Sequence, residues 1–207
     1  MQHRYVYGVV QTEDAIELET DAVGEAERVY PIEHRRHAAL VSDIDTTDPD
    51  RTDEDATRHD DVLRQLMLSN GGRTVVPMRY GMVFENERAL KNVLRGGSRV
   101  FRQTIREIDG TVELGLKVVR DEEDAVDAED VSERIEHVLD PLAVDSVQND
   151  LFSDRLLVNR SYLVDRDERD SFDEAVGHLE DELDELRFRY TGPFAPYSFV
   201  NIRIGAQ

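Results

Sequence analysis

Apolar and polar residues alternate along several short stretches of the chain, and this alternation predicts β-strands. The clearest stretch is Thr111–Val119, where every second residue from Val112 to Val118 is apolar. Successive strand residues point to opposite faces, so this pattern predicts a strand with one buried face. A second stretch, residues 37–44, is apolar on both faces and predicts a central strand. Other strands are predicted at residues 4–10, 27–33, 74–78, 156–164 and 198–204.

Apolar residues recur at every third or fourth position in other stretches, which predicts amphipathic helices. One helix is expected after Thr52, whose hydroxyl suits the N-cap position and is followed by acidic residues. Its inner face carries His59, Leu63 and Leu66. Four more helices are predicted at residues 87–95, 98–109, 131–142 and 172–186.

The order of these elements divides the chain into two halves. From Thr111 onward the order is strand, helix, strand, helix, strand, and residues 143–148 supply a further strand before Leu156. This gives βαββαβ, the ferredoxin-like order. The first half also mixes strands and helices. The predicted fold is therefore α+β, with an N-terminal α+β domain (residues 1–110) and a C-terminal ferredoxin-like domain (residues 111–207).

The charge balance is strongly acidic. The chain holds 46 Asp and Glu against 25 Lys and Arg, for a formal net charge of −21, and only Lys91 and Lys117 are lysines. Such self-repulsion destabilises a compact fold in dilute buffer. At about 1 M salt the screening length falls to roughly 3 Å, so the repulsion becomes local. The composition therefore indicates adaptation to a salty cytoplasm.

Composition also excludes several classes of function. The chain has no Cys, which excludes disulfides and zinc–thiolate sites. No apolar run approaches the ~20 residues of a membrane span, so we expect no membrane partner. The start of the chain lacks a signal-peptide pattern. The acidic balance, with no basic patch in view, argues against nucleic-acid binding.

The search for catalytic and metal motifs gives no strong candidate. Phosphate-binding loops and nucleophile elbows are absent from the sequence. An EF-hand-like frame places Asp43, Asp45, Thr47 and Glu54 at ligand positions, but Asp48 occupies the position that needs Gly. His178 and Glu182 lie one helical turn apart without a third ligand. His59 is expected at the core edge and not as a base. We therefore expect no catalytic residue, metal or cofactor.

The last apolar stretch, Thr191–Phe199, is the most unusual in the chain, since it combines two prolines, a glycine and three aromatic rings. Gly192 tolerates a positive φ and Pro193 donates no N–H, so the pair predicts a turn. The rings then have two interpretations. They pack in the core at the start of the final strand, or they form an aromatic docking surface.

Two segments together resemble a known family. The segment Val75–Gly81 (Val-Val-Pro-Met-Arg-Tyr-Gly) is similar to the Val-Leu-Pro-Met-Arg-Phe-Gly segment of the gas vesicle GvpF/GvpL family. Gly192–Phe199 resembles the family's closing Gly-Pro-Trp-Pro-Pro-Tyr-Ser-Phe, with Phe and Ala in place of Trp and the next Pro. Further similar landmarks follow in the right order at residues 5–10, 39–42 and 112–118. The length favours the GvpF type, and the composition favours a haloarchaeal member.

This resemblance implies a non-enzymatic accessory protein required for gas vesicle formation, located at the gas vesicle and in the cytoplasm. It implies binding to the hydrophobic shell protein GvpA and to other accessory gas vesicle proteins. The alternatives are a purely structural minor component of the vesicle, or a ligand-binding or enzymatic ferredoxin-like protein. We expect the docking surface among the residues of the two segments and their neighbours: Pro77, Arg79, Tyr80, Phe84, Phe194 and Tyr197.

Overall fold

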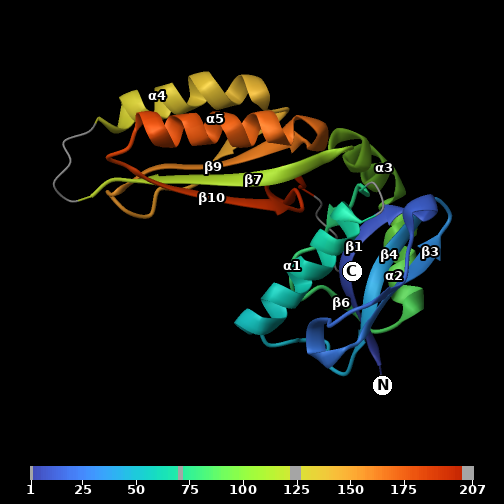
Figure 1. Ribbon diagram of the computed structural model, residues 1–207. Coiled ribbons are helices and arrows are strands. Elements are labelled where there is room, and N and C mark those ends of the chain that lie inside the picture. The colour runs from blue at the N-terminus through green and yellow to red at the C-terminus, as the bar shows by residue number, and fades with distance from the viewer. Residues whose placement is uncertain (1, 70–71, 122–126, 202–207) are drawn as a thin grey trace. The chain divides into compact units, whose positions relative to one another are not determined.

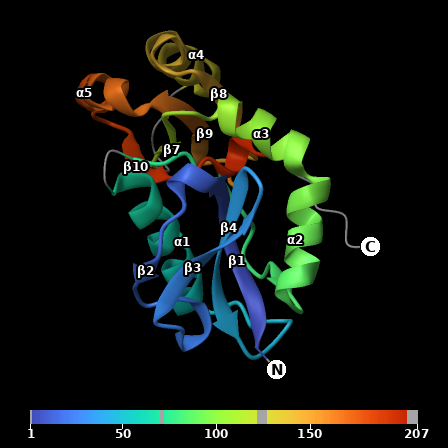
Figure 2. The ribbon, with the colours of Figure 1, turned by 90° about the vertical axis from the view of Figure 1, so that its right-hand side faces the viewer.

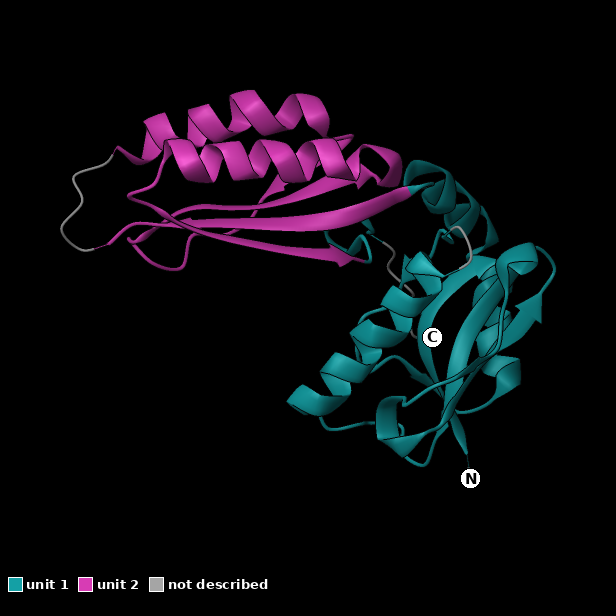
Figure 3. Ribbon diagram, viewed as in Figure 1, with its two compact units in different colours: residues 1–110, 195–207 teal, residues 111–194 magenta. Residues whose placement is uncertain are grey.

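The computed structural model describes residues 2–69, 72–121 and 127–201. The chain forms two compact units (Figure 3). Unit 1 comprises residues 1–110 and 195–207, and unit 2 comprises residues 111–194. Each unit has its own sheet and its own hydrophobic core, so each is described by itself.

Unit 1 is built on a six-stranded antiparallel sheet. Strands β1 (His3–Gln11) and β4 (His37–Ile44) pair at its centre. Around them the order is β2-β3-β4-β1-β5, and β6 also pairs with β1. The shorter strands are β2 (Leu18–Glu19), β3 (Arg28–His34), β5 (Val76–Pro77) and β6 (Val83–Phe84), with single 3₁₀ turns at Thr12–Asp14 and Val23–Glu25.

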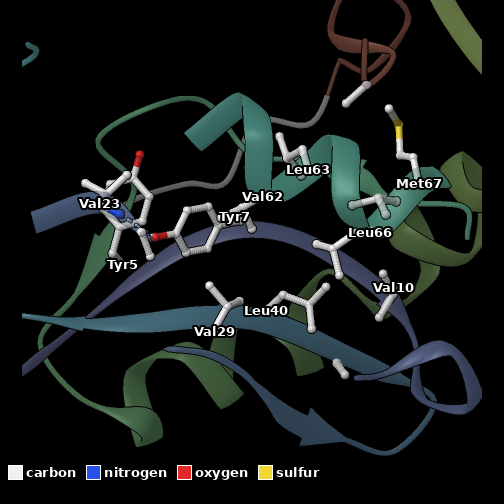
Figure 4. Close-up of a cluster of buried hydrophobic side chains, with 14 of the residues drawn as sticks. Tyr5, Tyr7, Val10, Val23, Val29, Leu40, Val62, Leu63, Leu66 and Met67 are labelled. Carbon is white, nitrogen blue, oxygen red and sulfur yellow. Dashed lines mark hydrogen bonds between the residues drawn. The ribbon is translucent and has the colours of Figure 1, made fainter. Parts of the chain in front are cut away.

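Helices cover both faces of this sheet (Figure 2). Helix α1 (Asp53–Leu68) packs on one face, and α2 (Glu87–Gly96) and α3 (Ser98–Glu107) pack on the other. Because strand residues alternate, β1 sends Tyr5 and Tyr7 to the α1 side and Val6 and Val9 to the α2–α3 side. Both faces are therefore buried, which explains why the middle of β1 (residues 5–10) and of β4 (residues 38–41) carries aromatic and aliphatic side chains on both faces. Figure 4 shows the α1 side of the core.

Two local features place α1 on the sheet. The Thr52 hydroxyl accepts a hydrogen bond from the Asp55 N–H at 3.0 Å, as the predicted N-cap requires. Gly8 lets the neighbouring strand approach closely, because a Cβ there would lie 2.6 Å from Val75 Cγ1 and 3.3 Å from Leu63 Cδ2. The register of β1 against β4 also shifts between Val6 and Gly8.

Unit 2 follows the order β7-α4-β8-β9-α5-β10. Its four-stranded antiparallel sheet has the strand order β10-β7-β9-β8, and α4 and α5 lie side by side on one face (Figure 1). The elements are β7 (Thr111–Val119), α4 (Ala128–Leu139), β8 (Asp145–Gln148), β9 (Leu156–Asp165), α5 (Arg169–Glu182) and β10 (Arg187–Phe194), with 3₁₀ turns at Asp140–Leu142 and Arg166–Glu168.

The α+β fold class is confirmed. The second half has the order βαββαβ, but its last strand is not the one predicted. The predicted final strand is wrong as far as the structure describes it, because Tyr197–Phe199 form a 3₁₀ turn and residues 200–201 are not in a strand. Residues 202–204 of that prediction lie outside the described residues. The strand that completes the second sheet is β10, which begins where the helix predicted at 172–186 was expected to end.

The end of the chain also belongs to a different unit from the one expected. The second domain was predicted to run to residue 207, but the compact unit ends at Phe194. From Ala195 onward the described chain packs in unit 1, where Ala195 is 3% exposed and Tyr197 contacts the α1-side core. The apolar side chains of the closing segment thus find their contacts beside α1 and not in a further strand.

Candidate functional site

The two family-like segments meet on α1, in unit 1. The ring of His59 on α1 lies 5.9 Å from the ring of Tyr80 and 6.4 Å from the ring of Tyr197, measured between centroids. Tyr5 and Tyr7 of β1 complete the group, at 5.6 and 5.3 Å from His59. We call the rings of Tyr5, Tyr7, His59, Tyr80 and Tyr197 the aromatic cluster.

His59 is the central hydrogen-bonding group of the aromatic cluster. Its Nε2 lies 3.1 Å from the Met78 carbonyl oxygen, which only accepts, so Nε2 carries the proton and donates. Its Nδ1 then accepts from the Tyr5 hydroxyl at 2.8 Å. Burial lowers the pKa of His59 to about 4, so the ring is neutral at neutral pH.

The two buried tyrosines extend this network to the backbone. The Tyr5 hydroxyl accepts from the Gly81 N–H at 3.3 Å, and the Tyr7 hydroxyl accepts from the Val23 N–H at 2.9 Å. Burial raises the pKa of both hydroxyls, that of Tyr7 to about 12. Tyr5, Tyr7 and His59 therefore keep the same protonation state near neutral pH. The inner part of the cluster therefore holds the chain around residues 78–81 in place.

The outer side of the aromatic cluster reaches the surface. Tyr80 and Tyr197 are half-buried, and Arg79 is exposed. The Tyr80 hydroxyl donates to the Asp50 carbonyl oxygen at 2.9 Å, and the Tyr197 hydroxyl donates to Asp60 Oδ1 at 3.2 Å. Burial raises the pKa of the Asp60 carboxyl despite this bond. A cationic side chain also lies at this surface, because Arg51 Cζ is 5.8 Å from the centre of the Tyr80 ring.

The structure separates the six residues predicted for docking. Tyr80 and Tyr197 come together at the aromatic cluster, with Arg79 next to Tyr80 in sequence. Pro77 is buried in β5, opposite Gly8 of β1. Phe84 packs on the α2–α3 side of the sheet. Phe194 is half-buried at the end of β10 in unit 2.

The inner members of the cluster were not predicted. Tyr5 and Tyr7 were predicted only as part of a strand and of a family landmark at residues 5–10, and His59 only as a residue at the core edge. One signal in the sequence is the spacing of the two tyrosines, which places both on one face of β1. That His59 lies opposite them depends on strand pairing between residues far apart in the chain, which local spacing does not reveal.

The weaker metal candidates have other partners. Asp43 Oδ1 lies 2.7 Å from Arg4 Nη1 and accepts a hydrogen bond from the Tyr30 hydroxyl at 2.8 Å. The Glu182 carboxylate accepts from Arg134 at 3.0 and 2.7 Å, and it faces α4. In the described part of the chain, no three His, Asp or Glu side chains lie close enough to hold a metal ion.

A second surface feature lies in unit 2, around the edge strand β8. The described chain exposes large apolar side chains at both ends of this strand, including Val144 at 60% just before it and Phe152 at 74% after it. Lys117 Nζ lies 5.3 Å from the centre of the Phe152 ring. We call this feature the apolar strip; its members are Leu142, Val144, Leu151 and Phe152.

Among the described residues, no helix combines the length and the apolar character needed to cross a membrane. A protein-family model described as gas vesicle synthesis protein GvpL/GvpF matches residues 3–132 and 125–201 of the chain. Its two matched ranges together cover nearly the whole chain.

Individual proteins match over similar lengths. Gas vesicle protein F of Haloferax mediterranei is 53% identical over 204 residues, covering 98% of this chain and 95% of that protein. Gas vesicle protein F1 of Halobacterium salinarum is 48% identical over 206 residues, covering 100% and 96%.

Two crystal structures share the fold. That of the gas vesicle protein GvpF from an Anabaena species has a TM-score of 0.86 at 20% identity, covering 100% of this chain and 99% of that one. That of GvpF from Microcystis aeruginosa has a TM-score of 0.85 at 16% identity, covering 97% and 99%.

Proposed function

The chain belongs to the GvpL/GvpF family of gas vesicle synthesis proteins, and from this we propose that it is an accessory protein of gas vesicle formation. In this role it binds the hydrophobic shell protein GvpA and other gas vesicle proteins during assembly, and it acts at the gas vesicle without catalysis. The observation that carries the proposal is the 53% identity to a gas vesicle protein F over 98% of the chain.

The surface chemistry supports a binding role. A shell subunit that lines a gas-filled space exposes apolar surface before assembly, and such surface associates readily. Unit 2 holds 25 acidic and 9 basic residues, so it resists aggregation, yet it exposes the apolar strip. An edge strand flanked by apolar side chains suits the docking of an extended segment of another protein. We therefore propose the apolar strip as a contact surface for GvpA.

The outer side of the aromatic cluster is the second proposed contact surface. It comes from the two segments that carry the family resemblance. It presents the half-buried Tyr80 and Tyr197, and the exposed Arg79 precedes Tyr80 in the sequence. Arg and Tyr are enriched in protein interfaces because each combines apolar area with hydrogen-bond donors.

Co-purification with GvpA in 2 M KCl tests the proposal. We expect wild type to retain GvpA, and we expect Val144→Ser combined with Phe152→Ser to reduce capture at least tenfold with unchanged circular dichroism. Arg79→Glu tests the second surface in the same way. Leu68→Ser is the matched control, since Leu68 is exposed at 47% but lies outside both surfaces.

The outcomes test the binding role and the two proposed contact surfaces independently. If wild type does not retain GvpA, the binding role is wrong. If every variant captures GvpA as well as wild type does, the contact lies on another surface. A deletion strain then distinguishes assembly from structure, because loss of vesicles demands an assembly role, whereas misshapen vesicles indicate a minor structural component. Immunodetection on washed vesicles shows whether the protein stays bound.

A further inference from the structure

The helical layer formed by α2 and α3 is basic, in contrast to the rest of the molecule. Between Glu87 at the start of α2 and Glu107 at the end of α3, the chain carries six basic side chains and no acidic one, although it has 46 acidic residues in all. The expectation that the chain has no basic patch is therefore wrong. We call these side chains the basic face; they are Arg88, Lys91, Arg95, Arg99, Arg102 and Arg106.

Packing explains why these cations share one surface. Both helices turn their apolar side chains toward the sheet, where Leu90, Leu94 and Phe101 are at most 2% exposed. The polar positions between them must then face away from the sheet. All five arginines of the basic face are exposed, and Lys91 is half-buried (Figure 2 shows the two helices).

The arginines of the basic face lack acidic partners. Lys91 pairs with Glu87, but within residues 2–69, 72–121 and 127–201 none of the five arginines forms an ion pair. Elsewhere in the same chain Arg4, Arg58 and Arg134 are all paired with carboxylates. With almost two acidic residues for each basic one, pairing is readily available to a surface arginine. Because these five arginines form no ion pair within the described residues, their guanidinium groups can bind carboxylates of another protein.

The hairpin between β3 and β4 extends this charge. It contributes Arg35 and Arg36. Its residue His34 lines a hollow of about 430 Å³ together with residues of α2, which are Glu87, Arg88, Lys91, Asn92 and Arg95. Burial lowers the pKa of the adjacent His37, and the nearby Arg102 and Arg36 lower it further. The His37 ring also lies 5.8 Å from the Phe101 ring of α3, measured between centroids, so the hairpin lies beside α3.

We propose that the basic face binds an acidic protein surface of another gas vesicle protein, one that places carboxylates beside apolar side chains. This inference rests on the proposed function and names a surface and a partner chemistry for it. Guanidinium groups bind carboxylates through two parallel hydrogen bonds, and such short contacts persist at molar salt, where longer-range attraction is screened.

Two observations favour a protein over a nucleic acid as the partner. Val100 is 46% exposed between Arg99 and Arg102, so the basic face has an apolar centre, as protein interfaces do. The whole chain carries a net charge of −21, which repels the long, uniformly charged backbone of a nucleic acid. A short acidic patch on a protein is repelled much less.

Pairwise binding in 2 M KCl tests this inference. The immobilised full chain is presented with GvpA and with each accessory gas vesicle protein, expressed one at a time, and Kd is measured. For at least one acidic partner, we expect Arg88→Glu combined with Arg95→Glu to raise Kd at least tenfold. The control is Arg187→Glu with Arg189→Glu, which changes the net charge equally but lies on β10 in unit 2.

The two proposals fail in different ways in this experiment. If wild type binds no gas vesicle protein, the proposed function is wrong. If wild type binds but the basic-face variant binds every partner equally well, the basic face is not an interface, while the proposed function stands. Circular dichroism of each variant shows whether it is folded, and Arg88→Gln with Arg95→Gln gives a milder version of the same test.

A second measurement needs no vesicle partner. A labelled helical peptide of alternating Glu and Ala should bind wild type in 0.5 M KCl at least tenfold more tightly than it binds the basic-face variant. Equal binding overturns the inference. Preferential binding of a DNA duplex through the basic face, or reversible self-association that the variant abolishes, also overturns it, because the occupant is then a nucleic acid or a second copy of the chain.

Discussion

Acidification should weaken unit 1 through one buried ring, that of His59. In the folded chain Nε2 donates to the Met78 carbonyl and Nδ1 accepts from the Tyr5 hydroxyl, so a second ring proton has no acceptor. Burial adds a desolvation cost for the charged ring. Protonation of His59 therefore destabilises the aromatic cluster.

The expected magnitude follows from the difference in pKa between the unfolded and folded chain. The pKa falls from 6.5 when unfolded to about 4 when folded. Between these values the unfolded chain binds more protons, so the free energy of unfolding decreases as pH falls. At 1.36 kcal/mol per pKa unit, the total loss is about 3 kcal/mol, and roughly 2 kcal/mol of it is reached at pH 5.

Urea unfolding in 2 M KCl between pH 8 and pH 4.5 measures this loss. Tyrosine fluorescence reports mainly on unit 1, because five of the seven tyrosines lie there. His59→Gln should be less stable at pH 8, since it loses one of the two ring hydrogen bonds, but it should lack the acid-dependent loss. His178→Gln is the matched control, because the exposed His178 ring is solvated in the folded protein.

The difference between wild type and His59→Gln is the quantity to compare. The raised pKa of Asp60 acts with the opposite sign, since the folded chain then binds more protons, but it is present in both proteins and cancels. If His59→Gln loses as much stability as wild type between pH 8 and pH 5, another group carries the acid sensitivity and the reasoning about His59 is wrong.

Three further changes test the packing, the helix cap and the charge balance. Gly8→Ala should lower the free energy of unfolding by about 1–3 kcal/mol in urea titrations, because its Cβ would lie 2.6 Å from Val75 Cγ1. Gly177→Ala, in α5 with no atom within 4 Å of the new Cβ, should instead stabilise by up to about 1 kcal/mol. Thr52→Ala should cost about 1 kcal/mol in the same assay, because the Asp55 N–H loses its acceptor. The melting temperature should fall from 2 M to 0.1 M KCl, since the net charge of −21 is then unscreened, and a constant value would contradict this.

Local pattern was enough to locate most helices and strands. Strand β7 was predicted with the bounds it has in the structure, because its alternation reflects one buried and one solvated face. Strand β4 was likewise predicted at 37–44 as a central strand, and it lies between β3 and β1. The cap at Thr52 was also predicted correctly, since capping depends only on neighbours within three residues.

Local pattern predicted the candidate sites much less well. Tyr80 and Tyr197 were singled out from their segments, but their meeting at His59 depends on the pairing of β1 with β5 and on the return of the chain to α1. The basic face was missed because its cations were judged against the acidic total. Their spacing along residues 88–106 was visible in the sequence, although their lack of acidic partners was not.

Sequence patterns sufficed to predict the fold class, the family and the acidic character of the surface. They also predicted the order of elements in the second half up to its last strand. These depend on periodicity, on short motifs and on composition, which are all local or additive. Tertiary structure decided where the last residues belong. Gly192, with φ at 122°, lies at the register shift of β10, and the chain after Phe194 returns to unit 1. Ala195 and Tyr197 bury apolar surface there, a gain that depends on a core formed by residues more than a hundred positions earlier.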